Sequence, residues 1–199
     1  MTLLIKRCKL AYFPVPKIAC TSIKHMLHEM KTGEPFKRRV RKNGKTVFIH
    51  ALYPALPFAD HPHDALADWH RVAVVRDPVK RLLSAYGNRV LHHRELSVES
   101  AGDQLKEADL APDPDLATFI NKLEAYFAAV HKVGHHAAPL VTFLGHDPGY
   151  FTRLYAFSEL PQMQVDMRAL TGKNIAMAHK QIGGPKLSPD DLTSAQIDR

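Results

Sequence analysis

Cysteine is scarce in this sequence of 199 residues, which contains only Cys8 and Cys20. Two cysteines cannot build the disulfide framework of a small secreted domain, so we expect a reducing compartment and predict a cytoplasmic protein. Long apolar runs are also missing. The N-terminus has three apolar residues before Lys6 and lacks the apolar region of a signal peptide. No stretch approaches the roughly 18 apolar residues of a membrane-spanning helix.

The rest of the composition is that of a globular protein. Apolar residues make up 45% and charged residues 24% of the chain, which excludes disordered and collagen-like classes. One domain over residues 1–199 is expected. There are 27 Lys and Arg against 20 Asp and Glu, a net charge of +7. This excess favours anionic partners such as a phosphate-rich cofactor, acidic glycans, anionic lipids or nucleic acid.

Strand-like and helix-like segments alternate along the chain, which predicts an α/β protein with a mainly parallel sheet. Asn43-Gly44 is expected to form the turn of a hairpin, because both residues accept the positive φ of that turn. Residues 48–53 would continue the second strand of this hairpin. The other expected elements are strands over 9–14, 70–75 and 153–157, helices over 22–30, 78–92, 116–133 and 161–170, a helix from Pro189 onward, and surface segments over 54–68 and 95–115.

The first candidate for anion binding follows the strand 9–14. Its sequence is Pro16-Lys17-Ile18-Ala19-Cys20-Thr21-Ser22-Ile23-Lys24. Small residues allow successive backbone N–H groups to converge on an anion, and the helix N-terminus that follows adds partial positive charge. The segment is not a Walker A loop, since the first 30 residues contain no glycine. The alternative is an ordinary strand–loop–helix in which Ser22 caps the helix.

The second candidate begins with Arg76, at the end of the strand 70–75, where open α/β sheets bind ligands. Its sequence is Val74-Val75-Arg76-Asp77-Pro78-Val79-Lys80-Arg81-Leu82-Leu83-Ser84-Ala85-Tyr86-Gly87-Asn88-Arg89. Asp77 is expected to cap the following helix, on which Ser84 lies in a polar row with Arg81 and Asn88. A guanidinium group and a hydroxyl suit a phosphate monoester. The alternative is that Arg76 pairs with a carboxylate and that Ser84 is solvated.

Together and in this order, the two segments resemble the nucleotide signatures of sulfotransferases, in particular the carbohydrate type of sulfotransferase family 2. The resemblance covers residues 9–92. Further along, His136-Ala137-Ala138-Pro139 resembles an H-x-x-P element of that group, with Leu140 in place of the expected glutamine. Residues 179–186 resemble a basic loop that closes over the nucleotide. The chain ends where relatives continue a helix, which indicates a truncated C-terminus.

The resemblance implies a P-loop-NTPase-like three-layer sandwich and the sulfuryl donor 3′-phosphoadenosine 5′-phosphosulfate, released as 3′,5′-adenosine bisphosphate. By resemblance, Lys17 neutralises charge on the bridging oxygen of the phosphosulfate. Arg76 and Ser84 hold the 3′-phosphate, which distinguishes this donor from ATP. The groups that hold the 5′-phosphate are the amides and hydroxyls of Ile18, Ala19, Cys20, Thr21 and Ser22.

A general base has to take the proton of the acceptor hydroxyl, and histidine is the residue type best suited to this at neutral pH. We predict His50, with His136 and His70 as the alternatives. No metal is expected, because cationic side chains and amides already neutralise the phosphates. The histidine pairs of the sequence also lack cysteine partners and H-E-x-x-H spacing.

The segment Lys37–Lys45 contains six positive residues among nine. It can be interpreted as a solvated basic hairpin. It can also be interpreted as a landing surface for a sulfated or carboxylated acceptor or for an anionic lipid head group.

The sequence therefore favours an enzyme that transfers a sulfuryl group to an acceptor hydroxyl, on a carbohydrate or a glycolipid. A P-loop-like kinase is disfavoured because Lys17 comes first in its loop and because Asp77 is better used as a helix cap than as a magnesium ligand. A nucleic-acid-binding module would use the basic hairpin, but aromatic residues are only 8% and do not interleave with it, so nucleic acid is not expected. A family member that binds nucleotide without turnover is a further alternative. The acceptor and the oligomeric state are left open.

Overall fold

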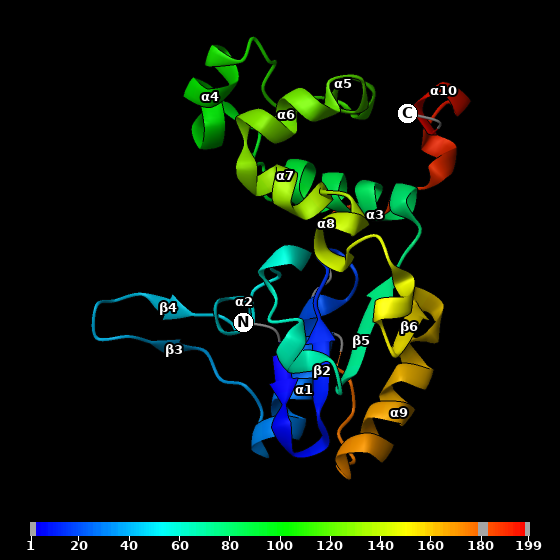
Figure 1. Cartoon of the computed structure of the whole chain (residues 1–199). Helices are drawn as coiled ribbons and strands as arrows, with labels where there is room; N and C mark the ends of the chain where they lie inside the picture. Colours follow the sequence, from blue (N-terminus) through cyan, green and yellow to red (C-terminus); the bar gives the residue numbers. More distant parts are fainter. Residues whose placement is uncertain (1–2, 179–182, 198–199) are drawn as a thin grey trace. The chain divides into compact units, whose positions relative to one another are not determined.

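The structure is a computed structural model that describes residues 3–178 and 183–197 (Figure 1). The chain forms two compact units, which are treated in turn. Unit 1 comprises Met1–Arg76 and Pro139–Gln181, and unit 2 comprises Asp77–Ala138 and Ile182–Arg199. The assignment of residues 1–199 to one domain stays a prediction. Four residues of the predicted basic loop 179–186, residues 179–182, lie outside the described residues.

Unit 1 is built on a four-stranded sheet with the order β1-β2-β5-β6. Its strands are β1 (Leu3–Ile5), β2 (Leu10–Phe13), β5 (His70–Val75) and β6 (Arg153–Ala156). β2, β5 and β6 run parallel to one another, and β1 pairs antiparallel to β2. All four residues of β2 are buried, so both faces of this strand are covered, as in α/β sandwiches. The predicted α/β class with a central, mainly parallel sheet is confirmed.

The helices α1 (Cys20–Thr32) and α9 (Leu160–Thr171) flank this sheet (Figure 1). α1 ends at Gly33, whose φ of 85° allows its N–H to bond to the carbonyl of Glu29. The predicted cap of α1 is wrong: the helix begins at Cys20, with Ala19 in the capping position, so Ser22 lies within the first turn. The other elements of unit 1 are the 3₁₀ turns η1 (Lys6–Cys8), η2 (Phe58–Asp60), η3 (Asp64–Leu66), η5 (Pro148–Tyr150) and η6 (Phe157–Glu159) and the helix α8 (Leu140–Leu144).

The predicted hairpin is present but short. β3 (Arg39–Val40) pairs with β4 (Thr46–Val47), and Gly44 in the turn has a φ of 76°. The expected continuation of the second strand over 48–53 is wrong, because a helix, α2 (Ile49–Leu52), follows instead. A two-stranded ribbon offers no further strand to pair with, whereas the helical turn buries Ile49 and Tyr53 together, four residues apart.

A cluster of rings packs where β2 ends, around the turns η2 and η5. Phe13 contacts His61 at 4.6 Å between ring centres, and it also meets Tyr150 at 5.7 Å and Phe151 at 5.3 Å. His61 is only 5% exposed. Burial disfavours the charged imidazolium and is the main cause that lowers the pKa of His61 to about 4.

This buried histidine should make unit 1 less stable in mild acid. Between pH 7 and pH 5 the unfolded chain binds a proton at position 61 while the folded chain does not, so the free energy of unfolding should fall by about 2 kcal/mol. Stability is therefore greatest above the unfolded pKa and is lost as the pH falls toward 4. Urea unfolding at both pH values, on the wild type and on His61→Phe, measures this difference. An equal loss of stability in both proteins would contradict the assignment to His61.

Unit 2 is helical and has a core of its own. Its elements are α3 (Pro78–Ala85), the π-helical η4 (Tyr86–His92), α4 (Val98–Glu107), α5 (Leu116–Asn121), α6 (Leu123–Ala129), α7 (His131–Ala137), η7 (Pro189–Asp191) and α10 (Ser194–Ile197). The predicted cap is confirmed: the carboxylate of Asp77 accepts the Lys80 N–H at 2.8 Å, with Pro78 at the first helical position. The core residues are Tyr86, Val90, Leu96, Ala101, Leu105, Leu110, Phe119, Ile120, Tyr126, Val130 and Val133.

Three predictions for unit 2 are wrong. The expected surface segment 95–115 contains α4, which buries Ala101 and Leu105 in the core. The expected single helix over 116–133 is broken at Lys122 and Val130, whose φ values are −116° and −122°. These breaks redirect the chain, so that α5, α6 and α7 each contribute residues to one core. The packing of this core outweighs the local preference for one continuous helix. In place of the expected helix from Pro189, the structure has the 3₁₀ turn η7 and the short helix α10.

Candidate functional site

The two candidate anion-binding segments meet at one edge of the sheet of unit 1. β2 and β5 run parallel, so the loop that follows β2 and Arg76, which follows β5, lie at the edge where the strands have their carboxyl ends. The Arg76 guanidinium donates a hydrogen bond to the carbonyl oxygen of Lys17 at 3.3 Å, although the two residues are 59 positions apart. Its carbon lies 4.9 Å from the ring centre of Phe157, which follows β6. Three strand ends thus contribute to one site.

The loop at Lys17 has an unusual backbone. Lys17 has a φ of 66° and Ala19 a φ of 48°, values that residues other than glycine adopt at an energetic cost. Ile18 between them is buried. Alternation of left-handed and ordinary residues turns successive N–H groups toward one point, a concave arrangement that binds anions. The sequence did not reveal this geometry, because the loop contains no glycine to mark the positive φ values.

The helix that follows adds to this arrangement. Ala19 gives α1 no side-chain cap, so no capping side chain competes for the first backbone N–H groups of the helix. These groups and the partial positive charge of a 13-residue helix favour an anion. Cys20 is buried, and Thr21 and Ser22 are half-buried in the first turn. The predicted 5′-phosphate residues therefore form one continuous loop and helix N-terminus.

His50 lies beside the first turn of α1. Its Nε2 is 3.0 Å from the hydroxyl oxygen of Thr21, and its Nδ1 is 3.1 Å from Nζ of Lys24. His50 belongs to the short helix α2 and is exposed. The structure thus places His50 beside the helical turn that follows the loop of Lys17, and its role as a base stays a prediction.

Lys24 belongs to this group of residues, and the sequence analysis gave it no role. It is only 1% exposed. Long side chains on a helix point back toward the N-terminus, which directs Lys24 toward the loop. Burial lowers the pKa of its ammonium, against a smaller opposing influence of Cys20. Its place three residues after Thr21, on the same face of α1, was the feature of the sequence that could have revealed it.

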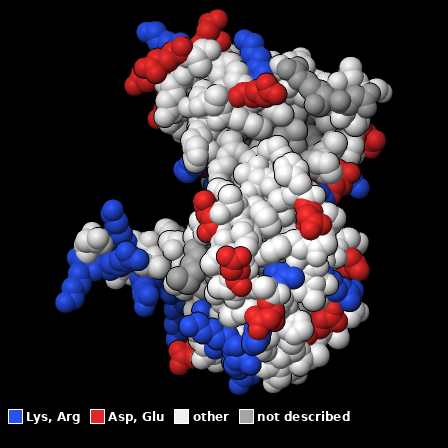
Figure 2. Space-filling model, in the orientation of Figure 1, with Lys and Arg blue, Asp and Glu red and all other residues white. Residues whose placement is uncertain are grey.

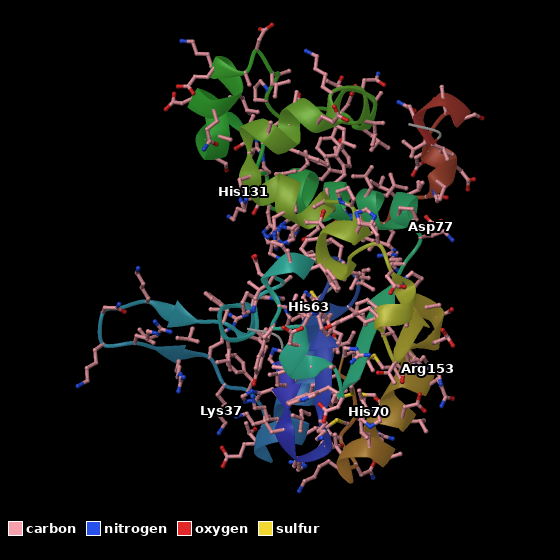
Figure 3. All side chains as sticks on the ribbon, in the orientation of Figure 1. Lys37, His63, His70, Asp77, His131 and Arg153 are labelled. Atoms are coloured by element: carbon pink, nitrogen blue, oxygen red, sulfur yellow. The ribbon has the colours of Figure 1, made fainter. Side chains whose placement is uncertain are left out.

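The alternative bases are differently placed. His70 is the first residue of β5 and pairs with Leu10, so it lies at the opposite edge of the sheet (Figure 3). At about 3.3 Å per residue, β5 separates it from Arg76 by about 20 Å. His136 belongs to unit 2, where Nε2 lies 2.9 Å from Nη2 of Arg89 and Nδ1 lies 2.8 Å from the carbonyl oxygen of Lys132. A guanidinium only donates and a carbonyl only accepts, so these partners fix the proton of His136 on Nδ1.

Ser84 is a half-buried residue of α3 in unit 2, and its part in phosphate binding stays a prediction. Arg81, expected beside it in a polar row, is instead 3% exposed. Its guanidinium donates to the carbonyl oxygens of Ala137, at 3.1 Å, and of Ala138 at the end of α7. That expectation for Arg81 is wrong, because the carbonyl groups at a helix C-terminus attract a cation into the interior of the unit.

The β3–β4 hairpin carries the strongest concentration of positive charge in the sequence. All residues from Lys37 to Thr46 are exposed, and Figure 2 shows the Lys and Arg side chains of the hairpin as a continuous blue group. Phe48 at its base is 45% exposed, and the centre of its ring lies 5.1 Å from the guanidinium carbon of Arg38. The second strand of the hairpin leads within three residues to His50.

Within residues 3–178 and 183–197, no three His, Cys, Asp or Glu side chains are grouped so that they could hold a metal ion. None of the helices in these ranges has both the length and the apolar character needed to cross a membrane.

Comparison with known proteins gives one match. The model of the Sulfotransferase family matches residues 2–154, a range that contains Lys17, His50 and Arg76. No curated protein and no solved structure matches the chain.

Proposed function

Because the chain belongs to the sulfotransferase family, we propose that it transfers a sulfuryl group from 3′-phosphoadenosine 5′-phosphosulfate to a hydroxyl group of a carbohydrate. Membership of the family makes the protein an enzyme of sulfuryl transfer, with a hydroxyl-bearing acceptor. The donor, the carbohydrate and the roles of single residues are the content of the proposal. The observation that carries it is the meeting of the Lys17 loop, Arg76 and His50 at the carboxyl edge of the sheet.

In the proposed reaction, the acceptor oxygen forms a bond to sulfur while the bond from sulfur to the bridging phosphate oxygen breaks. The electron pair of the broken bond passes to the phosphate, where the ammonium of Lys17 and the amides from Ile18 to Ser22 stabilise the charge. The acceptor hydroxyl loses its proton to His50. Arg76 and Ser84 bind the 3′-phosphate, a group that ATP lacks.

The basic hairpin supports an acceptor that is itself acidic. It brings six cationic residues within a short distance along the chain of His50, without a carboxylate among residues 37–49. A carbohydrate with carboxylate or sulfate groups would gain affinity and association rate from this field. The two free cysteines, Cys8 and Cys20, support the proposal of a reducing, cytoplasmic location.

Neutralising the hairpin tests the acidic acceptor. The triple change Arg39→Gln, Arg41→Gln and Lys42→Gln should weaken binding of a sulfated oligosaccharide by about tenfold at low salt, and the difference should shrink as salt screens the charges. Nucleotide affinity should stay as in the wild type, because the hairpin is a separate two-stranded sheet. An affinity for the oligosaccharide that changes neither with the substitutions nor with the salt concentration would contradict an acidic acceptor.

The donor site is tested by calorimetric titration with 3′,5′-adenosine bisphosphate, 5′-AMP and ATP. The wild type should prefer the bisphosphate by about tenfold or more, since a charge-assisted bond to the 3′-phosphate contributes about 1.5–3 kcal/mol. Arg76→Ala should abolish this preference while 5′-AMP binding persists. Lys80→Ala, an exposed cation shortly after Arg76, serves as the matched control. Equal affinity of the wild type for all three nucleotides would refute the proposed donor.

A further inference from the structure

Lys24 and His50 form a pair that the proposed function does not yet use. We propose that Lys24 acts as the second proton acceptor behind His50, so that the acceptor proton moves to Nε2 of His50 while the Nδ1 proton of His50 moves to Nζ of Lys24. The proposal rests on the proposed role of His50 as the base. It assigns to this chain a buried positioning residue for sulfuryl transfer.

Lys24 is buried directly beside His50. Nζ lies 3.1 Å from His50 Nδ1, and Lys24 is 1% exposed. None of the ion pairs found among residues 3–178 and 183–197 includes Lys24, and its side-chain partner in these ranges is His50. An ammonium carries three hydrogens, and among the described residues the side-chain acceptor found for them is Nδ1 of His50. A neutral amine has one lone pair and accepts one hydrogen bond, which Nδ1–H of His50 can donate.

The electrostatic environment of Lys24 disfavours a positive charge. His50 also contacts Thr21 in the first turn, so the Nζ atom beside it lies toward the N-terminal end of α1. The partial positive charge at a helix N-terminus disfavours an ammonium there. Burial acts in the same direction and lowers the pKa of Lys24. Both influences act toward the neutral amine. In the proposed arrangement this amine accepts from Nδ1–H, and the lone pair of Nε2 is left for a proton.

The other ring nitrogen of His50, Nε2, lies near the candidate phosphate loop. Nε2 lies 3.0 Å from the hydroxyl oxygen of Thr21, in the first turn of α1, directly after the candidate phosphate loop. In this tautomer Thr21 donates its hydroxyl hydrogen to Nε2. When Thr21 turns that hydrogen to a phosphate oxygen, Nε2 is left to the acceptor hydroxyl. The same nitrogen then lies at the donor loop and at the reacting oxygen.

The proton balance of the step is complete. The acceptor O–H bond breaks and an N–H bond forms at Nε2, while the Nδ1–H bond breaks and an N–H bond forms at Nζ. His50 ends neutral and Lys24 ends as an ammonium. The arrangement follows the logic of a catalytic triad, in which a buried group behind the histidine fixes its tautomer. Here the buried group is an amine, so it also takes up the proton, which returns to solvent by the reverse path.

The tautomer of His50 tests the proposal without any substrate. Long-range ¹H–¹⁵N correlation spectra of the ¹⁵N-labelled full chain distinguish Nδ1–H from Nε2–H, and His50→Gln identifies the signal among the 13 histidines. The proposal requires the Nδ1–H tautomer in the wild type. The Nε2–H tautomer would overturn it, because Lys24 would then be an ammonium that donates to Nδ1.

Two variants separate holding the tautomer from accepting the proton. In Lys24→Gln the amide oxygen accepts from Nδ1–H but cannot take the proton, so the tautomer should persist while kcat falls by about 10–100-fold. In Lys24→Met the preference for Nδ1–H should disappear and kcat should fall at least as far. In both variants KM for the donor and the affinity for 3′,5′-adenosine bisphosphate should change by less than about threefold.

The controls distinguish this proposal from the proposed function. Lys31→Met, on the same helix, should leave kcat and the His50 tautomer unchanged. In a His50→Ala background, Lys24→Met should cost nothing further, because the relay is already broken. Wild-type turnover in Lys24→Met would overturn the relay while leaving the sulfotransferase function intact. Failure of the wild type to bind the bisphosphate would instead refute the proposed donor. The tautomer of His50 would still test the proposed pairing of His50 with Lys24, because that measurement needs no substrate.

Discussion

Lys17→Met is expected to lower kcat by about 10²–10³-fold, because it removes the cation that we propose stabilises charge on the departing phosphate in the transition state. The hydrogen bond from Arg76 goes to the carbonyl oxygen of Lys17, so it does not depend on the side chain. Methionine keeps most of the length and the apolar stem of lysine. Steady-state kinetics with saturating donor and acceptor measures the effect.

The matched control is Lys31→Met, which removes a cation of unit 1 from an exposed position on α1. It should retain the kcat of the wild type. Lys17→Met should still bind 3′,5′-adenosine bisphosphate, with affinity reduced by about tenfold at most, since the amides of the loop remain. A variant that loses affinity in full proportion to kcat/KM would contradict a role specific to the transition state.

His50→Ala is expected to lower kcat by about 10²–10⁴-fold while leaving nucleotide affinity intact, because a general base acts on the acceptor and not on the donor. Since residue 50 is exposed, imidazole added to the solution can enter the space left by the side chain. It should restore part of the lost rate in proportion to its concentration. The measurement is kcat of the variant as a function of imidazole concentration.

His70→Ala provides the comparison, since His70 is also exposed but lies at the other edge of the sheet. It should retain wild-type turnover and show no response to imidazole. A His50→Ala protein with normal turnover would remove His50 as the base. It would also remove the reason for a proton relay through Lys24, but it would not affect the proposed donor site at Lys17 and Arg76.

Local features of the sequence indicated the candidate phosphate loop and Arg76. A buried strand followed by a polar residue predicts a ligand at a sheet edge, and parallel strands bring such residues to the same edge. The contact between Arg76 and the Lys17 carbonyl agrees with that rule. The positive φ values of Lys17 and Ala19 could not be predicted, because nothing in their residue types distinguishes them from ordinary helix and strand residues.

Long-range packing explains what the sequence analysis missed. A lysine among apolar residues on α1 is ordinary in sequence, and only the approach of α2 shows that Lys24 is buried against His50. The segment of helix α2 was predicted as a strand, because Ile and Tyr are common in strands. In the structure, one helical turn buries Ile49 and Tyr53 on the same side. The helical pattern over 116–133 likewise did not show where Lys122 and Val130 redirect the chain.

By itself, the sequence determined the α/β class, the strands β2, β5 and β6, the Asp77 cap and the two segments that resemble sulfotransferase signatures. These follow from short-range rules: buried runs form strands, and Asp-Pro begins a helix. Tertiary structure alone decided where α1 begins, how the loop of Lys17 curves, and that His50 lies between Thr21 and Lys24. Those features depend on which surfaces are buried against each other, and burial changes both the backbone a residue can adopt and the charge a side chain can keep.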